Sequence, residues 1–149
     1  MKRLPLALLL LTVAGCATAR PQAPAAVGLH GHRFSTELAT DDASREHGLM
    51  MRTALAADHS MLFVFPDTQP RWFWMKNTLI PLDILYFGAD RKLVSMQLDV
   101  PPCKADPCPS YPSDAPARYV LELPAGTARR IGAQAGDELT VEGDIGTVR

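Results

Sequence analysis

The sequence lacks the short motifs that mark the common nucleotide-binding and hydrolytic sites. It has no glycine-rich phosphate loop, no G-x-S-x-G elbow, no H-E-x-x-H pair and no internal repeat. It also lacks a long run of basic residues, and its 15 Lys and Arg against 16 Asp and Glu give a net charge of −1. Electrostatic binding to nucleic acid is therefore not indicated, and no cofactor is predicted.

What the sequence does have is a targeting segment at its start. Lys2 and Arg3 precede an apolar stretch over residues 4–13, which is too short to cross a bilayer and is typical of a signal peptide. The stretch leads into the motif V-A-G-C, which ends at Cys16 and resembles the lipobox of bacterial lipoproteins. This resemblance implies that Cys16 carries acyl chains such as palmitate and anchors the protein in a lipid bilayer. An ordinary secretory peptide with a chance cysteine is the alternative.

Composition divides the rest of the chain into a tether and one domain. Residues 16–28 are rich in Ala and Pro without apolar periodicity, which is typical of a flexible tether. Residues 29–149 are long enough for a single domain with a real core. Loss of the signal peptide, residues 1–15, leaves 13 basic against 16 acidic side chains, so the mature protein is mildly acidic. In Gram-negative lipoproteins, which this segment resembles, Asp directly after the lipidated cysteine retains the protein in the inner membrane. Residue 17 is Ala, which indicates an anchor in the outer membrane with the domain on the periplasmic side.

Cysteine is scarce, and the two that remain, Cys103 and Cys108, lie in a proline-rich loop over residues 101–116. In an oxidising periplasm so short a separation favours a structural disulfide of modest stabilising effect. A metal pair would need more ligands than the neighbouring sequence supplies, and a redox pair usually reads C-x-x-C.

Short alternating or wholly apolar runs predict a mainly β domain. Strands are expected at residues 32–39, 61–65, 71–76, 79–87, 93–100, 118–123 and 138–142, and short helices at residues 41–47, capped by Thr40, and 127–133. This pattern predicts a compact antiparallel sheet or a small barrel-like domain with two short helices.

Several longer motifs resemble those of a known family. They are R-E-H-G-L-M over residues 45–50, M-L-F-V-F over 61–65, F-W-M-K-N-T-L-I-P-L-D-I over 73–84, and Y-V-L-E-L-P-A-G over 119–126. Together with a closing Gly-Asp pair they resemble the domain-of-unknown-function family 192 over nearly all of residues 33–143. The resemblance implies a small β-rich envelope or secreted domain, and it implies no activity.

Asp83 is the most informative polar residue because it stands within an apolar strand, where a carboxylate needs a partner. One interpretation is a polar-aromatic binding pocket made of Trp74, Lys76, Asn77, Thr78 and Asp83. The other is structural, with Asp83 accepting backbone N–H bonds from the Asn77-Thr78 turn. Trp72 and Trp74 share one face of their strand, and an exposed aromatic pair could stack on a sugar ring or meet a partner.

Two further functions stay open from the sequence. Asp83 could act with Glu122 or Lys76 in a small hydrolase or transferase if these groups converge in an open cleft, although Glu122 could equally pair with Arg118 along its strand. Cu(I) binding is a candidate function because thioethers select this ion and the chain has five internal methionines, namely Met50, Met51, Met61, Met75 and Met96. No Met-x-x-Met or His/Met cluster is present in the sequence, and methionine is a common core filler.

The leading hypothesis is a non-catalytic, lipid-anchored β domain that binds an envelope component or a small polar ligand. It depends on the lipobox, the tether and a compact domain without a recognisable catalytic constellation. Whether Asp83 faces a pocket or accepts backbone hydrogen bonds is the observation that tests the pocket.

Overall fold

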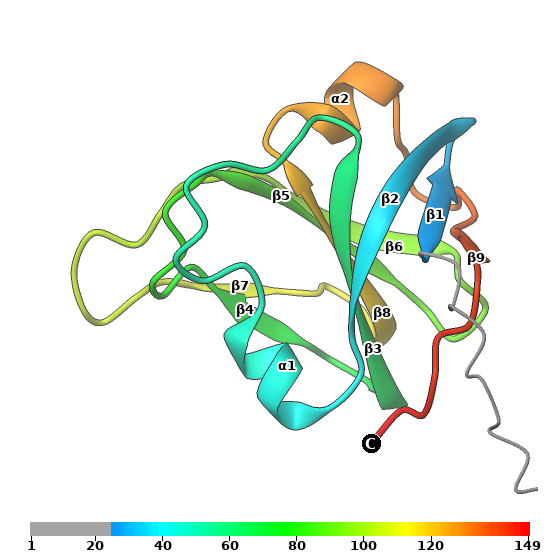
Figure 1. Cartoon of the computed structure of the whole chain (residues 1–149), viewed down its shortest axis with the longest axis horizontal. Coiled ribbons are helices and arrows are strands. Elements are labelled where there is room, and N and C mark those ends of the chain that lie inside the picture. Colours follow the sequence, from blue (N-terminus) through cyan, green and yellow to red (C-terminus); the bar gives the residue numbers. More distant parts are fainter. Residues whose placement is uncertain (1–24) are drawn as a thin grey trace, which may run out of the picture.

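The computed structural model describes residues 25–149, so the signal peptide, Cys16 and most of the tether lie outside the described residues. The strands are β1 (Ala26–Leu29), β2 (His32–Ala39), β3 (His59–Gln69), β4 (Trp72–Trp74), β5 (Leu82–Phe87), β6 (Leu93–Val100), β7 (Ser110–Pro112), β8 (Ala117–Pro124) and β9 (Thr140–Glu142), and the helices are α1 (Asp42–His47) and α2 (Thr127–Ile131). Seven strands form one sheet in the order β6-β5-β8-β3-β2-β1-β9, and β4 and β7 form a separate two-stranded ribbon (Figure 1). None of the helices in this part of the chain is long and apolar enough to cross a membrane.

The mainly β architecture with two short helices is the one that the sequence predicts, but the sheet is mixed and open. Strands β2 and β3 run parallel because the chain crosses between them through α1, whereas the other pairs are antiparallel. Of the two predicted alternatives, a sheet or a small barrel, the sheet is formed, because the edge strands β6 and β9 do not pair. Only the residues at and before their starts meet, at an isolated bridge between Lys92 and Glu138 and through backbone hydrogen bonds of Leu93 with Gly136 and Asp137.

Strand β1 lies in a stretch that the sequence assigns to the tether. It pairs with β2 on one side and with β9 on the other. Its Gly28 is needed for this position, because a Cβ atom there would come within 2.4 Å of Oγ1 of Thr140 on β9. A strand of four residues containing a glycine gives almost no periodicity, which explains why the sequence does not reveal it.

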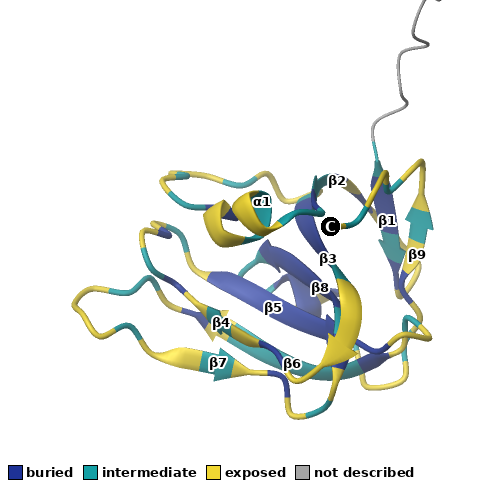
Figure 2. Cartoon of the chain, turned by 90° about the horizontal axis from the view of Figure 1, so that it is seen from below, coloured by how far each residue is buried: buried dark blue, intermediate teal, exposed yellow. Residues whose placement is uncertain are grey.

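The sheet carries an apolar core on each face, and its central strands are the most deeply buried (Figure 2). All six residues of β5 are buried, so alternate residues of this strand contribute to opposite cores. Leu85 and Phe87 belong to the core that α2 covers with Ala128 and Ile131. Ile84 and Tyr86 belong to the other core, on the side of α1.

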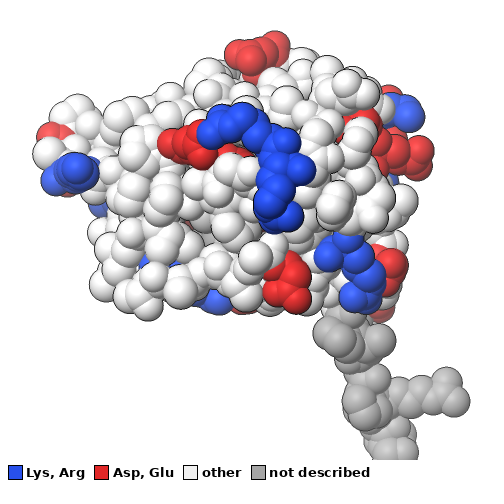
Figure 3. Space-filling view, turned by 90° about the horizontal axis from the view of Figure 1, so that it is seen from above, with Lys and Arg blue, Asp and Glu red and all other residues white. Residues whose placement is uncertain are grey.

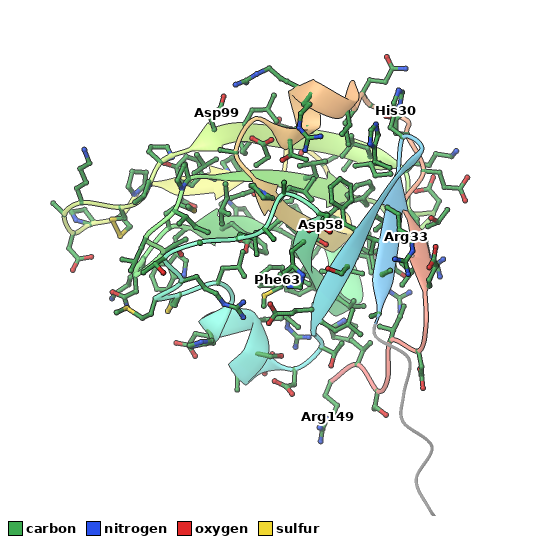
Figure 4. The ribbon with its side chains drawn as sticks, turned by 45° about the horizontal axis from the view of Figure 1, so that its top comes forward. His30, Arg33, Asp58, Phe63, Asp99 and Arg149 are labelled. Atoms are coloured by element: carbon green, nitrogen blue, oxygen red, sulfur yellow. A yellow bond between two sulfur atoms is a disulfide. The ribbon has the colours of Figure 1, made fainter. Side chains whose placement is uncertain are left out.

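Helix α1 begins with a capping box and ends against the sheet. Asp41, rather than the expected Thr40, is the N-cap, because its carboxylate accepts the N–H of Ser44 at 2.9 Å while Ser44 Oγ accepts the N–H of Asp41. The helix ends at Gly48, whose φ of 47° favours glycine and whose Cα lies so close to Phe63 that a Cβ would be 3.2 Å from the ring. Phe63 of β3, labelled in Figure 4, belongs to the core on the α1 side of the sheet. The end of α1 is thereby held directly over one face of the sheet.

The ribbon of β4 and β7 is anchored by the aromatic residue in the middle of β4. The Phe73 ring packs edge-on against Phe63, Phe65 and Tyr86, with centroids 5.0, 6.4 and 5.9 Å away. The Tyr86 hydroxyl also donates a hydrogen bond of 2.8 Å to the carbonyl of Tyr111, the middle residue of β7. The loop before β7 projects from the molecule in Figure 1 and contains the expected disulfide between Cys103 and Cys108.

Candidate functional site

A cleft of about 390 Å³ opens between α1 and the segment that follows β4. It is lined by Ala43, Glu46, His47, Met50, Trp74, Lys76 and Asn77. A narrower recess of about 30 Å³ continues from it into the molecule, sharing five of these residues and adding Thr78 and Glu122. The cleft and its recess together form a polar site with an aromatic rim and an acid at its inner end.

Two backbone turns hold the walls of this cleft together. Asn77 has a φ of 56°, a left-handed conformation that asparagine tolerates, and its carbonyl accepts the N–H of Met51 at 2.8 Å. The next residue, Thr78, donates its N–H to the carbonyl of Met75 at 3.2 Å. The wall that follows α1 and the wall that follows β4 are therefore tied to each other, and the cleft is part of the fixed structure.

Glu122 comes from β8, an inner strand of the sheet, where it lies between Met61 of β3 and Ile84 of β5. Glu122 is only 5% exposed, and burial raises the pKa of its carboxyl to about 8. The carboxyl therefore holds a proton at neutral pH. Within residues 25–149 no group forms a hydrogen bond with this carboxyl. Every fully enclosed polar side-chain atom in the same range has a hydrogen-bond partner, so the carboxyl oxygens are not fully enclosed, and Glu122 lines the recess. The carboxyl oxygens therefore open into the recess, where Glu122 can donate a hydrogen bond to a ligand.

Asp83 lies on the opposite face of the sheet from Glu122. It pairs in register with Leu123 of β8, and its neighbours in β5 on the same face, Leu85 and Phe87, belong to the core beneath α2. It is fully buried and accepts two backbone hydrogen bonds, from Asp99 N–H at 2.9 Å and from Ala128 N–H at 2.8 Å. Asp83 thus ties the end of β6 and the first turn of α2 to β5.

This position of Asp83 corrects two expectations from the sequence. Its backbone partners are not in the Asn77-Thr78 turn but in segments far along the chain, which no local pattern reveals. Asp83 also lines neither the cleft nor its recess, so the pocket does not contain it. The alternative in which Asp83 acts with Glu122 or Lys76 as paired catalytic groups fails, because Asp83 is separated from them by the sheet.

The other four residues of the expected pocket do come together. Trp74, Lys76 and Asn77 line the cleft, Thr78 lines the recess, and Lys76 Nζ lies 5.4 Å from the centroid of the Trp74 ring. The opposite wall, which includes Glu46, His47 and Met50, is not foreseen from the sequence, although these residues stand in one of the motifs that carry the family resemblance. Glu122 also does not pair with Arg118, since Arg118 donates to the carbonyl of Phe65 instead.

The methionines are dispersed rather than gathered around one point. Met61 and Met75 are buried in the core on the α1 side, Met96 packs on the other core, and Met51 is 66% exposed. Only Met50 lines the cleft, beside His47. In the region that the structure covers, no cluster of three or more His, Cys, Asp or Glu side chains could hold a metal ion.

The fold and the cleft define a small mixed-sheet domain with a polar site between a helix end and an aromatic strand. The family model DUF192, described as an uncharacterised ACR, matches residues 25–141, and the chain belongs to this family. This confirms the resemblance that the motifs indicate.

Two solved structures are similar to this chain. One is a crystal structure of a protein from Sinorhizobium meliloti 1021 that is described as a candidate transcription regulator; the two are 41% identical, with 85% of this chain and 98% of the other covered and a TM-score of 0.71. The other is a protein of unknown function from Novosphingobium aromaticivorans DSM 12444, 34% identical, with 85% of this chain and 94% of the other covered and a TM-score of 0.71. No curated protein matches.

Proposed function

We propose that this protein is a lipid-anchored binding domain on the periplasmic side of the cell envelope. A small polar ligand, or a polar group of an envelope component, enters the cleft beside Trp74 and Lys76 and accepts a hydrogen bond from protonated Glu122. The buried acid carries this proposal. Burying a carboxyl group without a protein partner costs stability, so its presence at the end of an open recess is best explained by a ligand that completes its hydrogen bonding.

The charge distribution supports a small ligand over nucleic acid. On the face shown in Figure 3, basic side chains form small groups with acidic side chains beside them, and uncharged surface separates the groups. Such a surface does not offer the continuous basic stripe that backbone phosphates require. The description of the Sinorhizobium protein as a candidate transcription regulator is therefore not extended to this chain.

The cleft can be tested by nuclear magnetic resonance on the purified protein. Amide signals are followed during titration with small envelope building blocks, namely N-acetylglucosamine, glycerol phosphate and D-alanyl-D-alanine. A ligand of the site shifts the amides of Lys76, Asn77 and Thr78 and binds less tightly to Glu122→Met, which keeps the side-chain length but cannot donate a hydrogen bond. Glu138→Met, the same change at an exposed acid on the far edge, behaves like the parent protein. Binding that leaves the cleft amides unmoved, or that is insensitive to Glu122→Met, would show that the site lies elsewhere.

The membrane anchor is tested separately by labelling cells with radioactive palmitate. The parent protein is expected to incorporate label and to sediment with the outer membrane. Cys16→Ser is expected to lose both properties, because the thiol is the acceptor of the lipid. If the parent protein incorporates no palmitate, the anchor is refuted, and the domain is secreted without a lipid.

A further inference from the structure

The two tryptophans stand outside the core on one side of β4 and continue the rim of the cleft. Trp72 is 67% exposed and Trp74 is 47% exposed, while Phe73 between them points into the core. Trp74 lines the cleft, but Trp72 does not, so Trp72 extends the aromatic surface beyond it. Side chains two residues apart on a strand are about 7 Å from each other on the same face. A ligand that enters the cleft can therefore continue over both rings.

The ribbon fixes the backbone from which these rings project. Trp72 pairs with Pro112 and Trp74 with Ser110 across the two strands, and the central Phe73 is held by three aromatic neighbours. A prearranged aromatic surface loses little conformational entropy when it binds. Large apolar side chains that are costly to expose and yet rigidly displayed usually mark a contact site.

The size of the exposed surface disfavours a protein partner. In the described region four large apolar side chains are exposed, and two of them are these tryptophans. A tryptophan has at most about 250 Å² to bury, and these two are only 67% and 47% exposed, so the pair offers at most about 290 Å². A stable protein interface buries about 800 Å² on each partner, of which more than half, about 450 Å², is apolar. The surface instead matches a narrow ligand with apolar faces and polar edges.

We propose that Trp72 and Trp74 form a stacking platform for the pyranose rings of a linear envelope glycan, with Lys76 and Asn77 binding its polar substituents. The C–H face of a pyranose packs on an aromatic ring, and its hydroxyl and acetamido groups need donors and acceptors at the ring edge. Lys76 lies over the Trp74 ring at 5.4 Å, and the Asn77 amide lines the same cleft. This inference rests on the proposed function, because the sugar that enters the cleft is the end of the glycan.

The chain contains only two tryptophans, so its indole N–H signals report directly on this platform. The purified protein is titrated with the β-1,4-linked tetrasaccharide of N-acetylglucosamine and, in parallel, with the N-acetylglucosamine monosaccharide. We expect the tetrasaccharide to shift both indole signals. Trp72→Leu, which keeps an apolar side chain but removes the planar face, should weaken tetrasaccharide binding about five- to tenfold, and Trp72→Phe should weaken it less. Binding of the monosaccharide in the cleft should be the same in all three proteins.

The outcomes separate the platform from the cleft. If neither indole signal moves with the tetrasaccharide, or if Trp72→Leu binds it as the parent does, the stacking platform is refuted. If the indole signals move but the cleft amide signals do not, and Glu122→Met binds the tetrasaccharide as the parent does, the platform stands and the proposed role of the cleft is refuted. Leu79→Ala, an exposed apolar residue outside the cleft and the ribbon, serves as the control that leaves both signals unchanged.

Discussion

Replacing Glu122 by Gln should make the protein more stable at neutral pH. In the folded state the pKa of Glu122 is raised from 4.5 to about 8 by burial, so between these values the folded protein keeps a proton that the unfolded chain has lost. Stability from this group is therefore complete below pH 4.5 and is lost as the pH rises toward 8. Each pKa unit corresponds to about 1.4 kcal/mol, which puts the loss at pH 7 at about 3 kcal/mol. Gln is neutral at every pH and does not incur this loss.

The assay is urea unfolding followed by circular dichroism at several pH values between 5 and 8. The quantity of interest is the free energy of unfolding of Glu122→Gln minus that of the parent, because groups common to both proteins cancel. That difference should be small near pH 5 and grow to about 3 kcal/mol at pH 7.

A difference that is flat from pH 5 to pH 8 would refute this reasoning, as would a Glu122→Gln protein that is less stable than the parent at pH 7. A flat difference would mean that Glu122 is ionised in the folded protein as it is in the unfolded chain. A less stable variant would mean that its carboxyl stabilises the folded protein instead of destabilising it. The hydrogen-bond donor role in the recess would then be lost, and the proposed function with it. Carbon-13 titration of the Glu122 carboxyl gives the same answer directly, because its folded pKa is the quantity in question.

Three other substitutions test the structural interpretation by thermal or urea unfolding. Asp83→Asn should lower stability by about 2–3 kcal/mol, because an amide group then faces one of two buried N–H donors; a change below about 0.5 kcal/mol would contradict the anchoring role. Joint replacement of Cys103 and Cys108 by Ser should cost about 2 kcal/mol, as expected for so short a closed loop, and an unchanged midpoint would argue against the disulfide. Glu37→Gln should cost less than about 1 kcal/mol, and since Arg52 lowers the pKa of Glu37, the cost should disappear as the pH falls below 4.5; a cost that persists at low pH would exclude the ion pair.

The parts of the fold that follow local patterns could be predicted from the sequence. Strand β2 and strand β6 have the expected bounds because their apolar residues alternate, and α1 ends at Gly48 as expected. Helix α1 also explains the main error in topology. A sequence pattern shows that a helix separates two strands, but it does not show that the second strand lies beside the first and parallel to it.

The candidate site could be predicted only along one stretch of chain. Trp74, Lys76, Asn77 and Thr78 are close in sequence, so a single motif brings them together. The opposite wall comes from the end of α1 and the inner end comes from β8, and no spacing rule connects these distant segments. Their meeting depends on the order of strands in the sheet, which the sequence alone does not determine.

The two buried acids show why polar intrusions into apolar strands need a structure for their interpretation. Asp83 and Glu122 each interrupt a strand of large apolar residues, and each strand is buried on both faces. They lie on adjacent strands one register step apart, so they point to opposite faces of the sheet. On one face Asp83 meets two backbone N–H groups and becomes a fixed brace. On the other face Glu122 meets a recess and keeps its proton. The alternation of a β-strand, rather than the type of residue, therefore decides which acid stabilises the fold and which is left for a ligand.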